Sequence, residues 1–251
     1  DKIIIRNQYS HRISTVKKSN GHSILRIIAY INARKLSNNL TGQEHNFSNK
    51  SGVIETGFYM PHGIKTDMTE EQFYNHIENN SHASTNIIAY SSIAALPPEL
   101  PPSEQVKLVD EFCNIFTEQY GTSISFAIHE ADNLMRKKAK LAEIEKYNLP
   151  VDDEDLRLQI QNNHVHFVIP YCKIEPMTEQ DLKAKRKKKS FGDTFKLGNQ
   201  VKDFNPIKYG SEIKKPSPDL MNIEQNFLQF MREKFCVSIN NGLEKNNRIE
   251  R

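Results

Sequence analysis

The chain has 251 residues, which is enough for one sizeable domain with a hydrophobic core. Its hydrophobic content is 37%, and no stretch approaches the run of about 18 apolar residues that a membrane span needs, so we expect a soluble protein without a membrane partner. The net charge is only +3, and three widely separated cysteines predict reduced thiols and a cytoplasmic location, which excludes a disulfide framework.

The first predicted elements are a strand within 2–16 and a helix within 19–36. At 100° per residue the buried stripe of this helix comprises Ile24, Ile28 and Ile31. Arg26, Tyr30 and Arg34 fall on the opposite side, which places Tyr30 one helical turn from an arginine in each direction. Two interpretations stay open at this point: a boundary tyrosine with two solvated arginines, or a hydroxyl presented to a phosphate that the guanidinium groups hold.

Loops, strands and helices alternate between this helix and residue 121. In chain order they are a polar, turn-rich stretch at 38–51, a strand at 52–60, a capped amphipathic helix at 69–79, a mostly apolar segment at 87–96 with a proline-rich connection after it, and a strong helix from Ser103 to Tyr120. We expect Ser103 to cap the last helix, and Gly121 to end it and lead the chain into the next strand.

Two short β segments carry three histidines. In 162–170, NNHVHFVIP, residues two apart point to the same face, so His164 and His166 lie about 6 to 7 Å apart on one face. In 122–130, TSISFAIHE, His129 lies on the face that carries the small side chains. If these strands pair, all three rings can hold one metal ion. A lone His-x-His pair is more often a pair of ordinary histidines, so the metal interpretation needs support from the rest of the chain.

The remaining segments are mostly charged or irregular. Residues 131–161 predict a charged helical excursion, 183–190 a basic loop, 191–217 little periodic structure, and 220–243 a closing helix. The run KAKRKKK at 183–189 has six positive side chains in seven residues. Such a run either binds phosphates through counterion release or forms a solvated loop.

Several motifs in fixed order resemble the MobA/MobL family of plasmid relaxases, which are HUH endonucleases. They read HSILRIIAYINARKL, TGQEHNFSNKSGVIETGFYMP, AALPPEL, FAIHE, NNHVHFVIP and MREKFCVSINNGLEKNNRIER. The resemblance covers essentially the whole chain, and the motifs together are specific. Together with the element pattern it predicts a single α+β domain over 1–251. We expect a central, mostly antiparallel sheet with helices on one face and the histidines on the other.

The resemblance also implies an activity, namely site- and strand-specific nicking of DNA during plasmid mobilisation. Tyr30 would be the nucleophile that forms a 5′-phosphotyrosine, and His129, His164 and His166 would hold a divalent ion, Mg²⁺ or Mn²⁺ or another transition metal. The substrate would be single-stranded DNA at a transfer origin, and the partners would be accessory relaxosome proteins and a secretion coupling protein. The expected DNA-binding residues are Arg26, Arg34, Lys185, Arg186, Lys187, Lys188 and Lys189.

The chain also departs from the family pattern. Family members carry acidic residues just before the Leu-Pro pair, where this chain has Ser91 and Ile93, and an aspartate where it has Asn46. Glu99 and Glu130 remain as candidates for the general base. The alternatives are therefore a catalytically impaired homologue that binds single-stranded DNA without cutting it, and a rolling-circle replication initiator. A metal-storage protein would need a higher density of histidine and cysteine.

Overall fold

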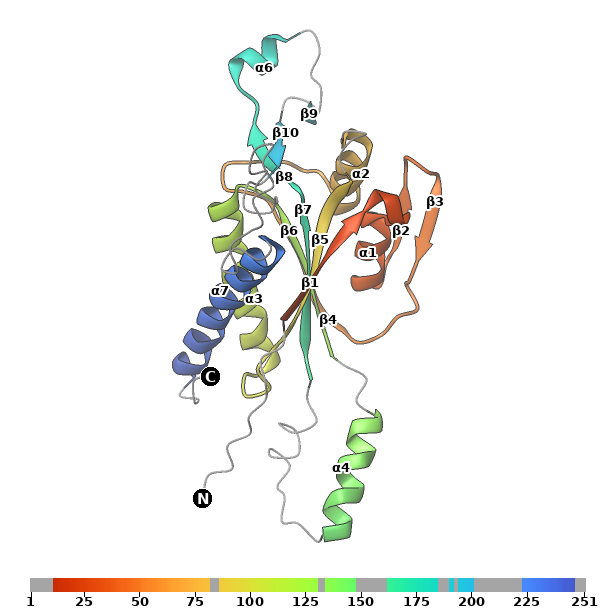
Figure 1. Ribbon diagram of the computed structural model, residues 1–251, viewed down its shortest axis with the longest axis vertical. Coiled ribbons are helices and arrows are strands. Elements are labelled where there is room, and N and C mark those ends of the chain that lie inside the picture. The colour runs from red at the N-terminus through yellow and green to blue at the C-terminus, as the bar shows by residue number, and fades with distance from the viewer. Residues whose placement is uncertain are drawn as a thin grey trace, which may run out of the picture.

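The computed structural model describes residues 11–81, 86–130, 134–147, 162–184, 190–191, 194–200 and 223–246. These residues form a central five-stranded sheet with helices on both of its faces and a smaller three-stranded sheet at one end (Figure 1). The first ten residues, the whole of 148–161 and the basic run 185–189 lie outside the described residues, so the predictions made for them stay predictions.

The central sheet is antiparallel throughout, with the strand order β1-β5-β7-β6-β4. Its strands are β1 (His11–Lys17), β5 (Ile87–Ala95), β7 (His164–Pro170), β6 (Ile124–His129) and β4 (Val53–Tyr59). The two predicted histidine strands are direct neighbours, and His129 lies opposite His164. Because residues opposite each other in a sheet share a face, the pairing places all three histidines on one side.

One face of the sheet packs against α3 (Pro102–Tyr120) and α7 (Ile223–Lys245). The apolar parity of β6 and β7 meets Phe112 and Phe235 there, and the ring centroids of these two side chains are 5.0 Å apart. Helix α3 begins at Pro102, so the expected cap at Ser103 is wrong. Proline suits the first helical position, because the N–H that it lacks would have no partner inside the helix.

The opposite face carries the histidines and also packs against α1 (Ile24–Ile31) and α2 (Glu70–Asn80), and the short turn η1 (Lys18–Asn20) between β1 and α1 buries no residue. The α+β class and the central antiparallel sheet are therefore confirmed. The prediction that helices cover only one face is wrong, because helices pack on both faces. The expected stripe of α1 is buried as predicted, and it meets Ala127 and Val168 of the sheet. These two small or medium side chains let α1 approach the strands closely.

Helix α1 is shorter than the sequence pattern indicated. It ends at Ile31, and Ala33 has a φ of 50°, a left-handed conformation that stops helical propagation. The chain then forms a two-stranded ribbon from β2 (Lys35–Asn38) and β3 (Gln43–Asn46), which was predicted as loop. The ribbon is polar on both faces over most of its length, so alternation of apolar residues did not indicate it.

A smaller sheet extends from the end of β7 and consists of β8 (Cys172–Pro176), β10 (Phe195–Gln200) and β9 (Ser190–Phe191), with α6 (Glu179–Lys183) beside it (Figure 1). Ile174, Phe195 and Leu197 join the core under α2, although none of these strands was predicted. Helix α4 (Leu134–Tyr147) lies within the predicted charged excursion 131–161, of which the other residues are outside the described part of the chain. In the described part of the chain, no helix has the length and apolar character to cross a membrane.

Glu78 of α2 caps the N-terminus of α1 from outside that helix. Its buried carboxylate accepts hydrogen bonds from the amides of Ile24 and Leu25, from Ser23 Oγ at 3.0 Å and from Asn38 Nδ2 at 2.6 Å. These groups need an acceptor because the first amides of a helix have none inside it.

We therefore expect Glu78→Ala to lower the free energy of unfolding by about 3 kcal/mol, because the buried donors lose their acceptor. Urea denaturation followed by circular dichroism measures this loss. Glu44→Ala is the control, since Glu44 is an exposed partner of Lys35 and should change the stability by less than about 0.5 kcal/mol. Equal losses in the two variants would show that Glu78 does not hold α1.

Candidate active site

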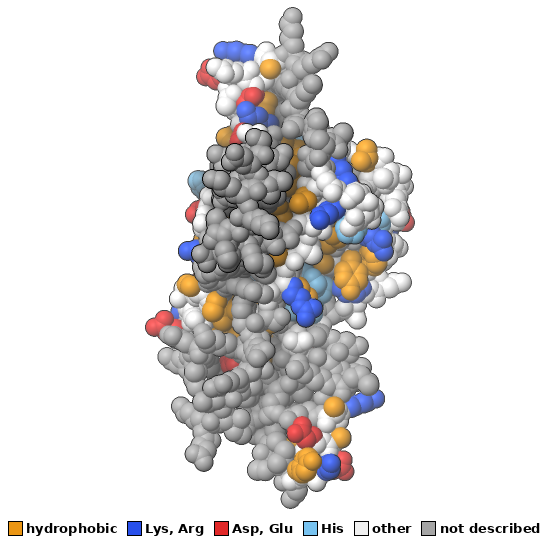
Figure 2. Space-filling view, in the orientation of Figure 1, with side chains coloured by type: hydrophobic (Ala, Val, Ile, Leu, Met, Phe, Trp, Pro, Cys, Tyr) orange, Lys and Arg blue, Asp and Glu red, His pale blue; other side chains and the backbone are white. Residues whose placement is uncertain are grey.

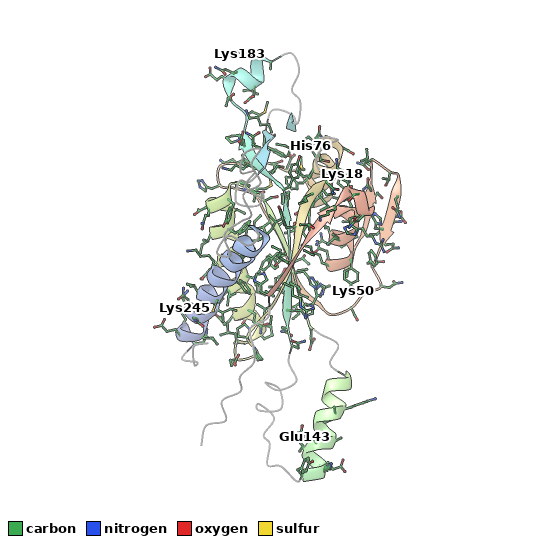
Figure 3. All side chains as sticks on the ribbon, viewed as in Figure 1. Lys18, Lys50, His76, Glu143, Lys183 and Lys245 are labelled. Carbon is green, nitrogen blue, oxygen red and sulfur yellow. The ribbon has the colours of Figure 1, made fainter. Side chains whose placement is uncertain are left out.

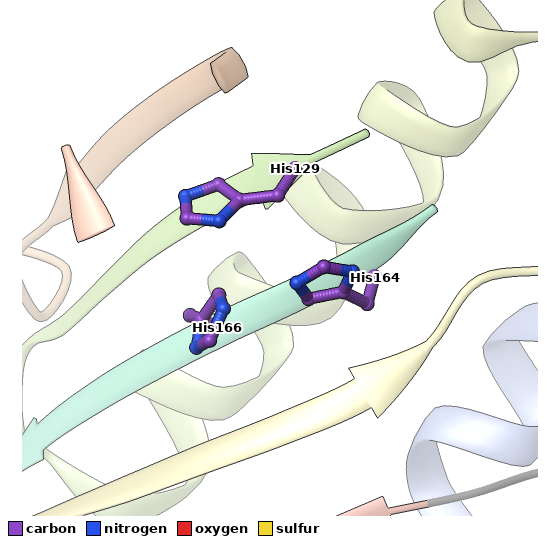
Figure 4. Close-up of side chains that lie close together, drawn as sticks. All are labelled: His129, His164 and His166. Atoms are coloured by element: carbon purple, nitrogen blue, oxygen red, sulfur yellow. The ribbon is translucent and has the colours of Figure 1, made fainter. Parts of the chain in front are cut away.

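The three predicted histidines converge on one face of β6 and β7 (Figure 4). The ring centroid of His129 lies 5.4 Å from that of His164 and 4.7 Å from that of His166, and the latter two centroids are 5.0 Å apart. One nitrogen of each ring can be chosen so that all three lie within 4.8 Å of one another. Strand alternation and cross-strand pairing produce this cluster, as the sequence pattern indicated.

Backbone carbonyl groups fix two of the rings. His129 Nε2 lies 2.6 Å from the carbonyl oxygen of Ile31, and His164 Nδ1 lies 3.3 Å from that of Asn162. A ring nitrogen that faces a carbonyl oxygen carries the proton, so the other nitrogen of each ring keeps its lone pair. Histidines that bind metals ordinarily have such a second partner.

The histidines lie in an environment that keeps them neutral. Burial is the main cause that lowers the pKa of His129 and His164, and the positive charge of Lys50 acts in the same direction. Burial and the two neighbouring rings lower the pKa of His166 to about 3. Neutral imidazoles are the form that binds a metal ion, so the cluster has the protonation state that a metal site needs.

Tyr30 lies at the C-terminal end of α1, one residue before the carbonyl group that contacts His129. Its side chain is 46% exposed, so a substrate can reach it. The Phe47 ring is perpendicular to the Tyr30 ring, with a centroid distance of 5.4 Å. The phenol is thus an accessible side chain held at the end of a buried helix, next to the histidine cluster.

Lys50 joins the tyrosine to the histidines and was not predicted as a site residue. Its Nζ donates to the carbonyl oxygen of Tyr30 at 3.3 Å, lies 3.2 Å from His129 Nδ1, and stands 3.9 Å from the centroid of the Tyr30 ring. Figure 3 shows Lys50 on the side of the sheet that α1 covers. Burial lowers the pKa of Lys50. The sequence placed this lysine in a polar, turn-rich stretch, where no periodic pattern singles it out.

A buried carboxyl group ties the end of α1 to α2. Glu70 Oε2 accepts a hydrogen bond from Asn32 Nδ2 at 2.8 Å, and Arg34 Nη1 lies 3.8 Å from the same oxygen. Burial raises the pKa of Glu70, although its bonds to Ser125 and Asn32 and the charge of Arg34 act in the opposite direction. Arg34 also donates to Thr56 Oγ1 at 3.2 Å. The sequence predicted that Arg34 lies one helical turn from Tyr30. Arg34 instead lies after the end of α1 and bridges α2 and β4.

The row of residues that crosses the sheet at His166 has a cation at each end. Ile93 and Ala127 lie opposite His166, Arg12 lies opposite Ile93 on the edge strand β1, and Thr56, the partner of Arg34, lies opposite Ala127. Arg12 is exposed and was not predicted as a site residue. Family members carry an acidic residue at the position of Ile93, and such a side chain would lie on the histidine face beside His166. This chain has an apolar side chain there.

The remaining predicted residues lie around the site or outside the described part of the chain. Arg26 is exposed on α1, and Glu130 is exposed directly after β6, with its amide donating to Gly52. Glu99 lies in the turn between β5 and α3. The basic residues 185–189 fall outside the described residues. In Figure 2, basic side chains lie beside histidine and apolar side chains on the side of the molecule that carries α1, β2 and β3.

The residues of the cluster fit a divalent metal ion. Three neutral imidazoles, two of which have backbone partners, form a set of nitrogen ligands that suits ions with an affinity for imidazole. An ion with three protein ligands keeps further coordination positions open for water or substrate. Typical metal–nitrogen distances of about 2.1 Å require the nitrogens to approach closer than about 4.2 Å, so the rings have to rotate slightly. His129 Nδ1 also has to exchange Lys50 for the ion, because its lone pair faces that lysine.

Comparison with known proteins finds a family and two mobilization proteins to which the chain is similar. The MobA/MobL family matches residues 22–251. The chain is 22% identical to the mobilization protein MobL of Acidithiobacillus ferridurans over 164 residues, which cover 64% of this chain and 42% of that protein. It is 21% identical to the probable mobilization protein MobA of Bifidobacterium longum over 96% of this chain and 40% of that protein. The chain thus spans about two fifths of the length of these relatives.

A solved structure has the same fold. It was reported as "Molecular Basis of Vancomycin Resistance Transfer in Staphylococcus aureus", and it superposes with a TM-score of 0.61 at 16% identity. The superposition covers 96% of this chain and 95% of the other chain. The shared fold therefore includes the central sheet and the helices on both of its faces.

Proposed function

Because the chain belongs to the MobA/MobL family, we propose that it is a relaxase that nicks one DNA strand at a transfer origin. Both named relatives are mobilization proteins, which supports a role in plasmid mobilisation. The observation that carries the proposal is the convergence of three neutral imidazoles beside an exposed tyrosine. Lys50 and the Ile31 carbonyl group connect the two parts of this site.

The proposed reaction is a transesterification in which Tyr30 Oη attacks the phosphorus atom of a phosphodiester. The Oη–P bond forms while the bond from phosphorus to the 3′ oxygen breaks, which leaves a 5′-phosphotyrosine and a free 3′-hydroxyl. The phenol proton passes to a general base, for which Glu99 and Glu130 remain candidates, and the 3′ oxygen takes up a proton. The phosphodiester is retained as an ester, so the strand can be rejoined.

His129, His164 and His166 would hold the divalent ion. When bound, the ion polarises the phosphate and stabilises the negative charge that develops on its oxygens. The described cluster contains nitrogen donors and no carboxylate, and nitrogen donors suit Mn²⁺ or another first-row transition ion better than Mg²⁺. We therefore propose a transition metal as the ion that this site binds most tightly.

The proposed DNA path crosses the histidine face of the sheet. Arg12 at one edge of the sheet, Arg34 at the other edge and Arg26 on α1 can each contact a phosphate of a strand whose scissile bond lies over His166. Proposed partners are single-stranded DNA at the origin, accessory relaxosome proteins and a secretion coupling protein, with the reaction taking place in the cytoplasm.

Incubation of the protein and Mn²⁺ with a supercoiled plasmid that carries the origin tests this function. We expect relaxed plasmid and a covalent protein–DNA adduct that survives denaturation, and we expect EDTA to prevent both. A plasmid without the origin is the control. Absence of both relaxed plasmid and adduct at every ion tried would contradict the enzyme proposal.

A binding protein without nicking activity is the second candidate function. The observation that favours it is the apolar Ile93 opposite His166, because no carboxylate lies at this position of the histidine face. Retention of the tyrosine and all three histidines favours the enzyme. A replication initiator would use the same chemistry, and a cognate site at a replication origin would identify it.

Neutralising Lys185, Arg186, Lys187, Lys188 and Lys189 to glutamine should weaken DNA binding mainly at low salt. Each phosphate contact that is lost lowers the slope of log Kd against log salt by about 0.7 for single strands. Fluorescence anisotropy of labelled single-stranded DNA between low and moderate salt measures the slope. A slope equal to that of the unmodified protein would show that this run is a solvated loop.

A further inference from the structure

Lys50 lies at the junction of the two halves of the proposed site. Its ammonium group contacts the main chain of Tyr30, the ring of Tyr30 and one nitrogen of His129. These contacts come from a turn, because the amide of Lys50 donates to the Phe47 carbonyl group at 2.9 Å. The same turn therefore supplies Phe47, whose ring is perpendicular to the phenol ring, and Lys50, whose ammonium group lies over the face of the phenol ring.

The charge of Lys50 is not neutralised in the described part of the chain. None of its contacts is negatively charged, and it forms no ion pair with a described carboxylate. Lys35 differs in this respect, because its Nζ lies 2.8 Å from Glu44 on the neighbouring strand. A half-buried ammonium group surrounded by neutral partners gains most from an anion that approaches it.

We propose that Lys50 contacts the phosphate that Tyr30 attacks. The proposal rests on the proposed function and extends it. Lys50 lies within one of the motifs that resemble the family, but it was not among the site residues expected from the sequence. A phosphate within reach of Tyr30 lies beside this ammonium group, which is the only described lysine that contacts both the tyrosine and the histidine cluster. Lys50 is then a catalytic residue, since it touches the reacting phosphate.

The chemistry explains what such a contact does. As the Oη–P bond forms and the bond to the 3′ oxygen breaks, negative charge accumulates on the non-bridging oxygens. An ammonium group that lies beside the tyrosine stabilises this charge. The cation–π contact also holds the phenol ring beside Lys50, which limits the positions that Oη can take.

Lys50→Met removes the charge and keeps most of the side-chain volume, whereas Lys50→Arg keeps the charge. Lys35→Met is the matched control, because it removes an exposed lysine that already has a carboxylate partner. Binding is measured with each substitution in a Tyr30→Phe background, so that no cleavage occurs. The probe is a fluorescent thirty-nucleotide oligothymidylate, titrated at several salt concentrations.

We expect Lys50→Met to lower the slope of log Kd against log salt by about 0.7, and Lys50→Arg and Lys35→Met to leave it unchanged. With Tyr30 present and origin DNA saturating, Lys50→Met should slow adduct formation at least about 10-fold, because a preorganised charge is lost from the transition state. An unchanged slope, or a slope that falls equally in Lys35→Met, would overturn the proposal.

Mn²⁺ titration of the same variants separates a phosphate contact from a structural role. Lys50→Met should bind Mn²⁺ at least as tightly as the unmodified protein, because it retains all three histidines and loses a competing cation. Loss of Mn²⁺ binding would mean that Lys50 builds the histidine cluster, and the phosphate contact would then be rejected. If the unmodified protein forms no adduct, the proposed function fails. The slope of log Kd against log salt still tests the contact of Lys50 with phosphate, because this binding measurement requires no cleavage.

Discussion

Tyr30→Phe is expected to abolish the covalent protein–DNA adduct while the affinity for DNA stays within about twofold of the unmodified protein. The substitution removes only the hydroxyl group. The ring keeps its contact with Phe47 and its place beside Lys50, so the fold and the DNA surface should not change. Denaturing gel electrophoresis of labelled origin DNA measures the adduct, and fluorescence anisotropy measures the affinity.

Tyr147→Phe is the matched control for this substitution. Tyr147 on α4 is also exposed and also has a lysine over its ring, with Lys146 Nζ 5.0 Å from the centroid, but it has no role in the proposed site. It should form adduct at the rate of the unmodified protein. Adduct formation by Tyr30→Phe would assign the nucleophile to another tyrosine, and Tyr9 would be the next to test.

His166→Ala is expected to weaken Mn²⁺ binding at least about 100-fold, because a three-ligand site loses the ligand that lies within 5.0 Å of both other rings. The adduct should disappear at an Mn²⁺ concentration that saturates the unmodified protein, and part of the activity should return at higher concentrations. Isothermal titration calorimetry measures the affinity, and the adduct assay measures the activity.

His62→Ala controls for the loss of a histidine that lies outside the cluster, since His62 is exposed in the loop after β4. This variant should bind Mn²⁺ as the unmodified protein does. If His166→Ala keeps both the Mn²⁺ affinity and the adduct, the cluster is not the metal site, and the metal-dependent mechanism has to be abandoned.

The core of the site could be predicted because local periodicity determines it. Alternation placed His164 and His166 on one face of β7 and His129 on the small-residue face of β6, and the apolar stripe of α1 showed which side of this helix is buried. These patterns depend only on neighbours in the sequence. Whether β6 pairs with β7 could not be predicted from the sequence, because the two strands are separated by a long segment.

The rest of the site depends on contacts between distant segments, which no periodic pattern reveals. The left-handed conformation at Ala33 ends α1 early, and this moved Arg34 from the helix to a bridge between Glu70 and Thr56. Lys50 follows a ribbon whose polar residues resemble a loop in sequence. The turn that holds it is fixed by backbone contacts to Phe47 and by packing against Tyr30.

Mass spectrometry of the adduct tests the central claim most directly. After the reaction with origin DNA and Mn²⁺, nuclease and trypsin digestion should leave a nucleotide phosphate on the tryptic peptide 27–34, which contains Tyr30 as its only tyrosine. Fragmentation should assign the added mass to Tyr30. An adduct on any other residue, or an unmodified peptide 27–34 from protein that has demonstrably nicked the DNA, would contradict the assignment of Tyr30 as the nucleophile.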